Sequence, residues 1–213
     1  MPYIDGKYAC YALSYTGGAT LKWFRDNFAE CETAECKSKD KNVYAYLDGK
    51  CKSTPTGILV LPHFAGAATP YMDNDSKAVF CGITLETAKY DLYKALMEGT
   101  SYEIRLNFEK LREYTGSIKT LRATGGGALS DVWLSIKADI LGMEIAALDC
   151  NEVGAAGTAA LAGMAVGCYK NLADTTAKMA PVRKTFLPDR QNASAYNSLY
   201  SKYKNIYKLY KSI

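Results

Sequence analysis

Three consecutive glycines lie between a strand-like and a helix-like stretch in the segment TGGGALS, residues 124–130. Because glycine has no Cβ, such a run lets the backbone come close to a planar or anionic ligand. The N-terminus of the following helix would offer unpaired N–H groups and the positive end of a dipole. The spacing matches neither the GxGxxG nor the GxxxxGK[ST] pattern. The run indicates either a nucleotide-binding turn or a tight strand-to-helix turn, and Gly17-Gly18 is a weaker second instance.

Nucleophilic catalysis finds little support in the residue pattern. The single histidine, His63, lies in LPHFAG, and the sequence contains no GxSxG motif. We therefore expect His63 to be a core or loop residue rather than a catalytic one.

The seven cysteines are scattered and include no CxxC pair. Cys31, Cys36 and Cys51 share one polar stretch, but a tetrahedral zinc site usually needs a fourth ligand and closer pairing. We expect no metal site and free thiols, which favours a reducing, cytoplasmic location. The first ten residues also lack the basic and apolar regions of a signal peptide.

The composition of the 213-residue chain, with 48% hydrophobic and 23% charged residues, is that of a globular protein. It excludes a disordered chain, a collagen-like fibre and a disulfide-rich miniprotein. A formal charge of +4 requires neither nucleic acid nor a membrane as partner. Residues 153–169 are uncharged but rich in alanine and glycine, and shorter than the roughly 20 residues that cross a bilayer. We predict a buried helix there.

Strand and helix patterns alternate along the chain, which predicts an α/β fold. Strands are expected at residues 7–15, 58–62, 79–83, 118–123 and 143–147. Helices are expected at residues 19–29, near 43–47, from Thr84 as N-cap to beyond Tyr102, from Ser130 as N-cap to Leu141, and from 153 onward. Residues 30–56 form a polar, lysine-rich excursion. The core-facing stripe of the long helix comprises Leu85, Ala88, Leu92, Ala95, Leu96, Gly99 and Tyr102.

A C-terminal amphipathic helix is predicted at about residues 193–212, where tyrosines recur every three or four positions among lysines. A basic aromatic helix would suit RNA or a membrane surface. Packing of the tyrosines on the domain, with the lysines in water, explains the same pattern more simply. We favour this structural interpretation, with no nucleic acid and no membrane as partner.

Four ordered segments resemble the C-terminal half of the FGGY family of carbohydrate kinases, with xylulokinase-like members the most similar. They are GILVLPHFAGAATPYMD (57–73), FCGITLETAKYDLYKALMEGTSYEI (80–104), LRATGGGALSDVWLSIKADILG (121–142) and EVGAAGTAALAGMAVG (152–167). The positions that match the family's C-terminal signature are Ala78, Phe80, Gly82, Ile83, Asp91, Leu92, Ala95, Met97 and Glu98. Ala67 and Ala68 depart from the family's GERTP loop, where they replace a charged pair. The resemblance covers nearly the whole chain, 1–213, apart from residues 30–56.

The resemblance implies a ribonuclease-H-like, actin-like ATPase domain that binds ATP, with Mg²⁺ held mainly through the phosphates. Gly126 and Gly127 would back the nucleotide, and Ser130 would hydrogen-bond near it. Gly18 would approach the phosphates and Lys22 the nucleotide. The parent enzyme would phosphorylate a hydroxyl of a ketose, a polyol or a sugar acid.

The resemblance also implies parts that do not occur in these 213 residues. The sequence contains no DxGT loop, no GTS-type loop and no match to the family's catalytic aspartate, so we expect no catalytic residue in this chain. The domain would be incomplete at its N-terminal strands, leaving unpaired backbone edges. An N-terminal polypeptide, a second copy in a homodimer or a rearranged sheet would cover them. Two hypotheses follow: the ATP-binding part of a sugar kinase, or a non-catalytic binding or assembly module of the same ancestry.

Overall fold

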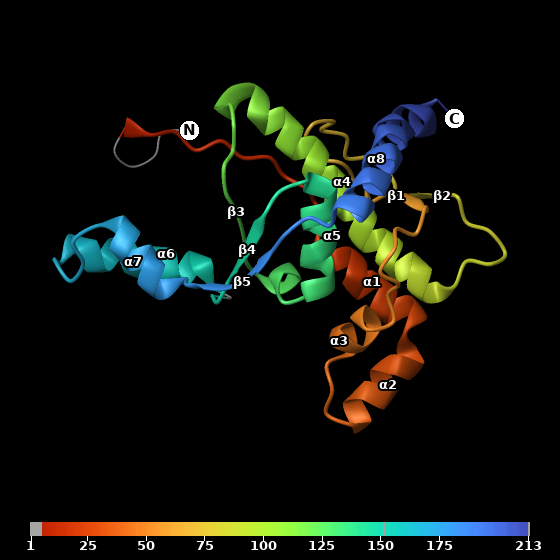
Figure 1. The fold of residues 1–213 in the computed structure, drawn as a ribbon, viewed down its shortest axis with the longest axis horizontal. Coiled ribbons are helices and arrows are strands. Elements are labelled where there is room, and N and C mark those ends of the chain that lie inside the picture. Colours follow the sequence, from red (N-terminus) through yellow and green to blue (C-terminus); the bar gives the residue numbers. More distant parts are fainter. Residues whose placement is uncertain (1–5, 151, 213) are drawn as a thin grey trace.

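The structure, a computed structural model, describes residues 6–150 and 152–212 (Figure 1). Helices and strands alternate along the chain. The helices are α1 (Gly18–Phe28), α2 (Glu30–Ser38), α3 (Val43–Asp48), α4 (Lys89–Thr115), α5 (Asp131–Leu141), α6 (Val153–Ala165), α7 (Leu172–Met179) and α8 (Arg190–Lys211). The strands are β1 (Leu59–Leu61), β2 (Val79–Cys81), β3 (Leu121–Ala123), β4 (Ile145–Leu148) and β5 (Val182–Phe186).

The strands form two separate sheets. Strands β1 and β2 pair antiparallel, whereas β3 pairs parallel with β4, and β4 pairs antiparallel with β5. The order β3-β4-β5 leaves the second edge of β3 without a partner among the described strands. Four of the five predicted strands are confirmed: the ranges 58–62, 79–83 and 118–123 contain β1, β2 and β3, and 143–147 overlaps β4. The α/β class is confirmed as well.

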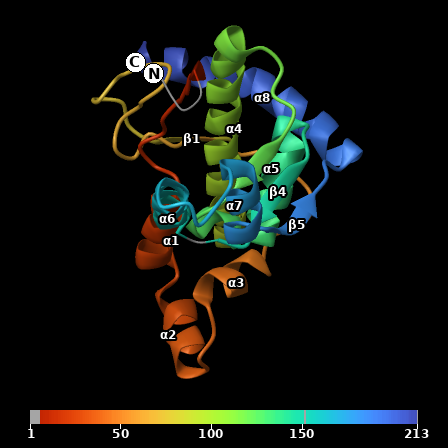
Figure 2. The same cartoon turned by 90° about the vertical axis from the view of Figure 1, so that its left-hand side faces the viewer.

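Helix α4 is the axis of the core (Figure 2). Its residues 93–103 are all buried, and the two ends of the helix are more exposed. Helices α1, α5 and α8 and strand β1 all contact it. Buried on all sides, a helix must present large apolar residues in every direction, and Tyr93, Leu96, Met97 and Tyr102 do so. The rest of the domain is assembled around this helix.

The long helix starts later than the sequence predicted. Its first residue is Lys89, and the Asp91 carboxylate accepts the Ala88 N–H at 3.1 Å. Thr84 is not the N-cap, because its hydroxyl accepts the N–H of Glu86 at 3.3 Å within a separate turn. The predicted core positions Leu85 and Ala88 are therefore wrong: both lie before the helix and are exposed.

The predicted strand at residues 7–15 is also wrong. Residues 9–14 form no β-strand, although Figure 1 shows them drawn out along the body of the protein. The Leu13 N–H donates to Thr69 Oγ1 at 3.1 Å, and the Leu13 carbonyl accepts from Asn107 Nδ2 at 3.2 Å. Hydrogen bonds to a loop and to α4 thus take the place of a sheet partner.

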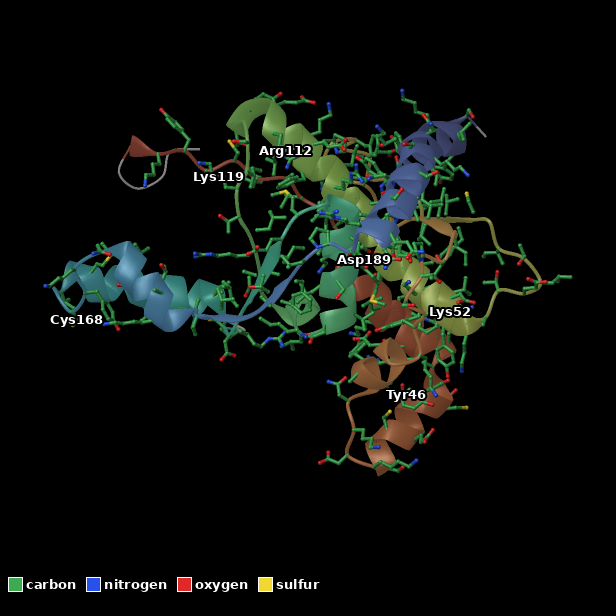
Figure 3. The ribbon with its side chains drawn as sticks, viewed as in Figure 1. Tyr46, Lys52, Arg112, Lys119, Cys168 and Asp189 are labelled. Carbon is green, nitrogen blue, oxygen red and sulfur yellow. The ribbon has the colours of Figure 1, made fainter. Side chains whose placement is uncertain are left out.

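The alanine- and glycine-rich stretch forms a helix, α6, but not a buried one. Of its described residues only Ala160 is buried, because α6 packs on α7 and the pair extends away from the core. Figure 3 places Cys168 at the tip of this extension. Within 6–150 and 152–212, no helix has the length and apolar character needed to cross a membrane.

The polar excursion at residues 30–56 is more ordered than its composition suggested. The short helix predicted near 43–47 is confirmed as α3, and α2 precedes it. Glu32 is buried, accepts the Tyr90 hydroxyl at 2.8 Å and pairs with Lys89. Leu47 is fully buried in the core. The excursion is thereby attached to the start of α4.

Helix α8 confirms the structural interpretation of the tyrosine pattern. Tyr196, Tyr200 and Tyr203 are buried in the core, and the lysines of the helix are exposed. The Tyr196 hydroxyl donates to the buried Glu98 carboxylate at 2.9 Å. These tyrosines therefore pack in the core of the domain.

We expect Gly99→Ala to lower the free energy of unfolding by about 2 kcal/mol or more. An added Cβ would stand 2.8 Å from the Val60 Cβ, and closer still to the Val60 carbonyl oxygen, where α4 crosses β1. Urea denaturation would measure the change. Gly157→Ala in exposed α6, where no heavy atom lies within 4 Å of the new Cβ, is the matched control and should cause no loss. Equal stability of the two variants would contradict the close packing at Gly99.

Candidate nucleotide site

A cavity of about 560 Å³ lies between α1, α3, α4, α5 and the glycine run. Fourteen residues from these elements line it: Gly18, Ala19, Leu21, Lys22, Asn42, Tyr44, Ala45, Asp48, Tyr93, Gly126, Gly127, Leu129, Ser130 and Trp133. All five site residues that the family resemblance implied, Gly18, Lys22, Gly126, Gly127 and Ser130, are among them. Segments more than 100 residues apart in the sequence thus meet at one cavity.

The glycine run forms a tight turn, η2 (Gly126–Ala128), for two separate reasons. Gly125 has φ +77°, a conformation that other residues rarely adopt, and a Cβ on Gly127 would lie 3.1 Å from Trp133 Cζ3. Backbone shape and packing therefore account for these two glycines. Gly126 is different, because no protein atom lies within 4 Å of where its Cβ would stand. The space beside Gly126 is open.

Trp133 supports the wall behind the turn. Its indole N–H donates to the Met97 carbonyl at 3.1 Å and to Ser101 Oγ at 3.2 Å, both on α4. Lys137 Nζ lies 4.0 Å from the centre of the indole ring. Burial lowers the pKa of Lys137 to about 8. The indole is held from both sides, so this wall is rigid.

Helix α5 has the ends that the sequence predicted. Ser130 Oγ accepts the Trp133 N–H at 3.0 Å, and Gly142 ends the helix with φ +62°. At its first turn, the Asp131 carboxylate pairs with Lys184 at 2.7 Å and with Arg183 at 3.0 Å, both on β5. These pairs lower the pKa of Asp131. Strand β5 thus fixes the start of α5 beside the glycine turn.

Asp48, at the end of α3, is the acidic residue among the described lining residues. It is half-buried, and its Oδ1 accepts the Tyr93 hydroxyl at 3.0 Å. Burial raises the pKa of Asp48, an effect that hydrogen bonds from Ser130 and Tyr93 oppose. Sequence reasoning missed Asp48, Tyr44 and Asn42 because they lie in the polar excursion. The one signal was Asn42, a helix N-cap residue placed directly before an aromatic stretch.

The opposite wall, formed by α1, carries positive charge. The Gly17 carbonyl accepts the Thr20 N–H at 3.2 Å, which starts the helix, and no side chain caps its first N–H groups. No heavy atom lies within 4 Å of a Cβ added at Gly18. Lys22, one turn further along, is exposed. This wall suits an anionic group, whereas the apolar residues Leu21, Tyr44 and Trp133 suit a planar ring.

Within the described parts of the chain, no group of three or more His, Cys, Asp or Glu residues is arranged to hold a metal ion. Cys31 is exposed and Cys36 is buried, so they differ in environment although they lie on the same helix.

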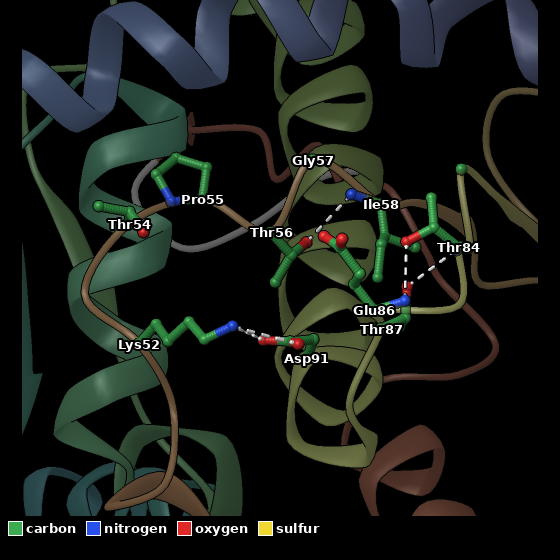
Figure 4. Close-up of a pocket in the computed structure, with 11 residues that line it drawn as sticks. Lys52, Thr54, Pro55, Thr56, Gly57, Ile58, Thr84, Glu86, Thr87 and Asp91 are labelled. Carbon is green, nitrogen blue, oxygen red and sulfur yellow. Dashed lines mark hydrogen bonds and ion pairs between the residues drawn. The ribbon is translucent and has the colours of Figure 1, made fainter.

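A second, more polar pocket of about 390 Å³ lies between residues 52–58 and 82–91 (Figure 4). Its polar groups bond to one another: Lys52 pairs with Asp91 at 3.0 Å, and the Thr84 N–H donates to Thr87 Oγ1 at 2.9 Å. Thr56 donates its hydroxyl to Glu98 beneath the pocket. These bonds hold the chain at the start of α4, and we assign this pocket a structural role.

His63 is a core residue, as expected. Its Nδ1 lies 2.7 Å from Ser76 Oγ, and its Nε2 lies 3.7 Å from Glu103 Oε1, while Ser14 donates to the other Glu103 oxygen. The order Ser, His, Glu resembles a catalytic triad, but His63 and Ser76 have no exposed surface. No substrate can reach them, so the cluster is structural.

The α/β core and its glycine turn fit the ribonuclease-H-like domain that the resemblance implies. Residues 2–166 match the C-terminal domain of the FGGY family of carbohydrate kinases, and the chain belongs to this family. It is 29% identical over 210 residues to a xylulose kinase of Staphylococcus epidermidis, covering 99% of this chain and 41% of that protein. It is 33% identical over 171 residues to a glycerol kinase of Geobacillus, covering 79% of this chain and 33% of that protein.

Solved structures agree with this assignment. The crystal structure of a xylulose kinase from Rhodospirillum rubrum superposes with a TM-score of 0.78 at 25% identity. The match covers 92% of this chain and 38% of that one. The chain thus spans about two fifths of the length of its xylulose kinase relatives.

The buried pair His63 and Glu103 predicts a specific pH dependence of stability. Burial raises the pKa of Glu103 from 4.5 to about 7, so the folded state keeps a proton that the unfolded state loses, and stability falls as pH rises through this window. Burial lowers the pKa of His63 from 6.5 to about 4, so its contribution to stability rises with pH over that range. The two effects oppose each other between about pH 4.5 and 6.5.

His63→Gln should remove the contribution of His63 to stability, which rises with pH. We expect the free energy of unfolding of this variant, measured by urea denaturation, to fall from about pH 4.5 to 7. The wild type should change less over the same range. Glu103→Gln should show the reverse slope, with stability rising between about pH 4 and 6.5. Parallel pH profiles for all three proteins would contradict this account.

Proposed function

We propose that the cavity binds the adenosine part of Mg-ATP, and that the chain is the ATP-binding part of a kinase that phosphorylates a sugar hydroxyl. The observation that carries the proposal is the meeting of Gly18, Lys22, Gly126, Gly127 and Ser130 at one cavity. Family resemblance alone selected these positions from distant parts of the chain.

The chemistry of the walls supports this assignment. Open space beside Gly126 admits a flat ring against the backbone, and the lining residues Trp133 and Tyr44 are apolar and aromatic. The uncapped start of α1 and the Lys22 ammonium favour the phosphates. Mg²⁺ is carried by the phosphate oxygens, since the described residues offer no cluster to hold it.

The substrate proposed for the whole enzyme is a ketose, a polyol or a sugar acid. Relatives include xylulose kinases and glycerol kinases, and the compounds in both names carry several hydroxyl groups. We assign no catalytic residue within these 213 residues, so the chain by itself is proposed to be inactive. Use of ATP and free thiols favour a cytoplasmic location.

The partner proposed for this chain is the N-terminal part of an FGGY kinase. The second edge of β3 has no described partner strand, and an open edge exposes N–H and C=O groups that favour pairing. Large apolar side chains are also exposed in the described part of the chain, including Tyr11, Tyr15 and Leu161. A second copy in a homodimer is the alternative cover. A non-catalytic assembly module would use the same edge without binding nucleotide.

Saturation-transfer NMR with Mg-ATP on the purified chain tests nucleotide binding. The wild type should give ligand signals, and Gly126→Leu should lose them, because the new side chain enters the cavity from a Cβ that has no heavy atom within 4 Å. Gly157→Leu in α6, equally unobstructed, is the matched control and should leave the signals unchanged. Absence of signal from folded wild-type chain would overturn the nucleotide proposal.

Hydrogen exchange tests the partner. When the chain is coexpressed with the N-terminal half of a related xylulose kinase, we expect the two to copurify and the amides of β3 to exchange more slowly than in the chain alone. A dimer of this chain that protects β3 equally well would assign the edge to a second copy and refute the N-terminal partner.

A further inference from the structure

The cavity contains a carboxylate where a nucleotide, itself an anion, is proposed to bind. Asp48 lines the wall formed by α3, inside the polar excursion at residues 30–56 and outside the four motifs that first suggested the family. A carboxylate near a triphosphate would repel it, so Asp48 requires an explanation of its own.

We propose that Asp48 accepts a hydrogen bond from the exocyclic amine of adenine, and thereby makes the cavity select adenine over other purine nucleotides. This inference rests on the proposed function of the cavity. Asp48 is then a specificity-determining residue that touches the nucleobase and takes no part in phosphoryl transfer.

The Asp48 side chain is held in place and can still accept further hydrogen bonds. An ionised carboxylate has about four lone-pair positions. The Tyr93 hydroxyl donates to one oxygen at 3.0 Å, and Ser130, whose hydroxyl counters the rise in the pKa of Asp48, occupies one further position at most. Two acceptor positions remain, on a side chain that lines the cavity. Its ligand must therefore present a donor.

The helix that carries Asp48 is itself well anchored. Asn42 caps α3 by accepting the N–H groups of Tyr44 at 2.8 Å and Ala45 at 3.2 Å. Leu47, adjacent to Asp48, is fully buried in the core. A carboxylate on such an element keeps its position when a ligand arrives, which specificity requires.

Charge decides which part of the nucleotide meets Asp48. The phosphates are attracted to Lys22 and to the uncapped start of α1, and are repelled by the carboxylate. The base would then lie against the lining residues Tyr44, Asp48 and Trp133. Tyr44 and Trp133 offer it apolar surface, and Asp48 offers it an acceptor.

The difference between purines makes the inference testable. Adenine carries an amine donor at C6, whereas hypoxanthine carries a carbonyl oxygen at the same position. A carbonyl oxygen opposite a half-buried carboxylate sets two acceptors against each other and leaves both unpaired. We therefore expect the wild-type chain to bind Mg-ATP about 10- to 100-fold more tightly than Mg-ITP.

Calorimetric titration of Mg-ATP, Mg-ITP and Mg-2′-deoxy-ATP into wild type and Asp48→Asn provides the test. The asparagine keeps an oxygen that accepts from the Tyr93 hydroxyl, and it adds an amide N–H that donates to the carbonyl oxygen of hypoxanthine. The preference for ATP over ITP should narrow to about threefold or less. Glu30→Gln, an equal charge change at an exposed position in the same excursion, should keep the wild-type preference. Thermal unfolding of each variant shows whether it is folded.

Each outcome decides between the two proposals. Wild type that binds no nucleotide overturns the proposed function together with this inference. Wild type that binds ATP and ITP equally overturns base selection alone. Asp48→Asn that keeps the full preference for ATP, or that loses only the difference between ATP and 2′-deoxy-ATP, also overturns it; the latter would place the carboxylate at the ribose.

Discussion

The buried carboxylate of Glu98 is the interaction on which the packing of this domain depends. It has no exposed surface, and it accepts the Thr56 N–H at 3.2 Å, the Thr56 hydroxyl and the Tyr196 hydroxyl at 2.9 Å. Lys94 Nζ, also buried, lies 3.4 Å away and donates to the Thr54 carbonyl. Burial raises the pKa of Glu98, and Lys94 opposes the shift. A buried charge tolerates no missing partner, so α4, α8 and the segment before β1 must come together for any of them to be stable.

The candidate site follows from this arrangement. With α4 fixed at the centre, its Met97 carbonyl and Ser101 hydroxyl orient the indole of Trp133, and the indole sets how closely the glycine turn can approach. On the other side, Tyr93 of α4 holds the carboxylate of Asp48. Two parts of the cavity lining are therefore positioned by one helix, and the rigidity of the cavity comes from the core rather than from loops.

The molecule is uneven in how completely it is packed. One side is a dense core of aromatic and aliphatic residues around α4. On the other side, the three-stranded sheet has an open edge at β3, and α6 packs mainly on α7. Backbone groups at an open edge and an exposed alanine-rich helix are costly features for an isolated domain. The chain spans about two fifths of the length of its relatives, and the N-terminal partner proposed above would cover both features.

Local signals in the sequence determined the elements with strong ends and the family to which the chain belongs. Ser130 and Gly142 delimit α5, the spacing of tyrosines defines α8, and the ordered motifs identified the positions that meet at the cavity. Local signals failed where distant contacts decide the outcome. Residues 9–14 have strand-like composition but bond to Thr69 and Asn107, and α6 has the composition of a buried helix but lacks a core to cover it. Asp48 entered the site for the same reason: only the folding of the polar excursion onto α4 places its carboxylate beside Tyr93, and nothing in the neighbouring residues encodes that contact.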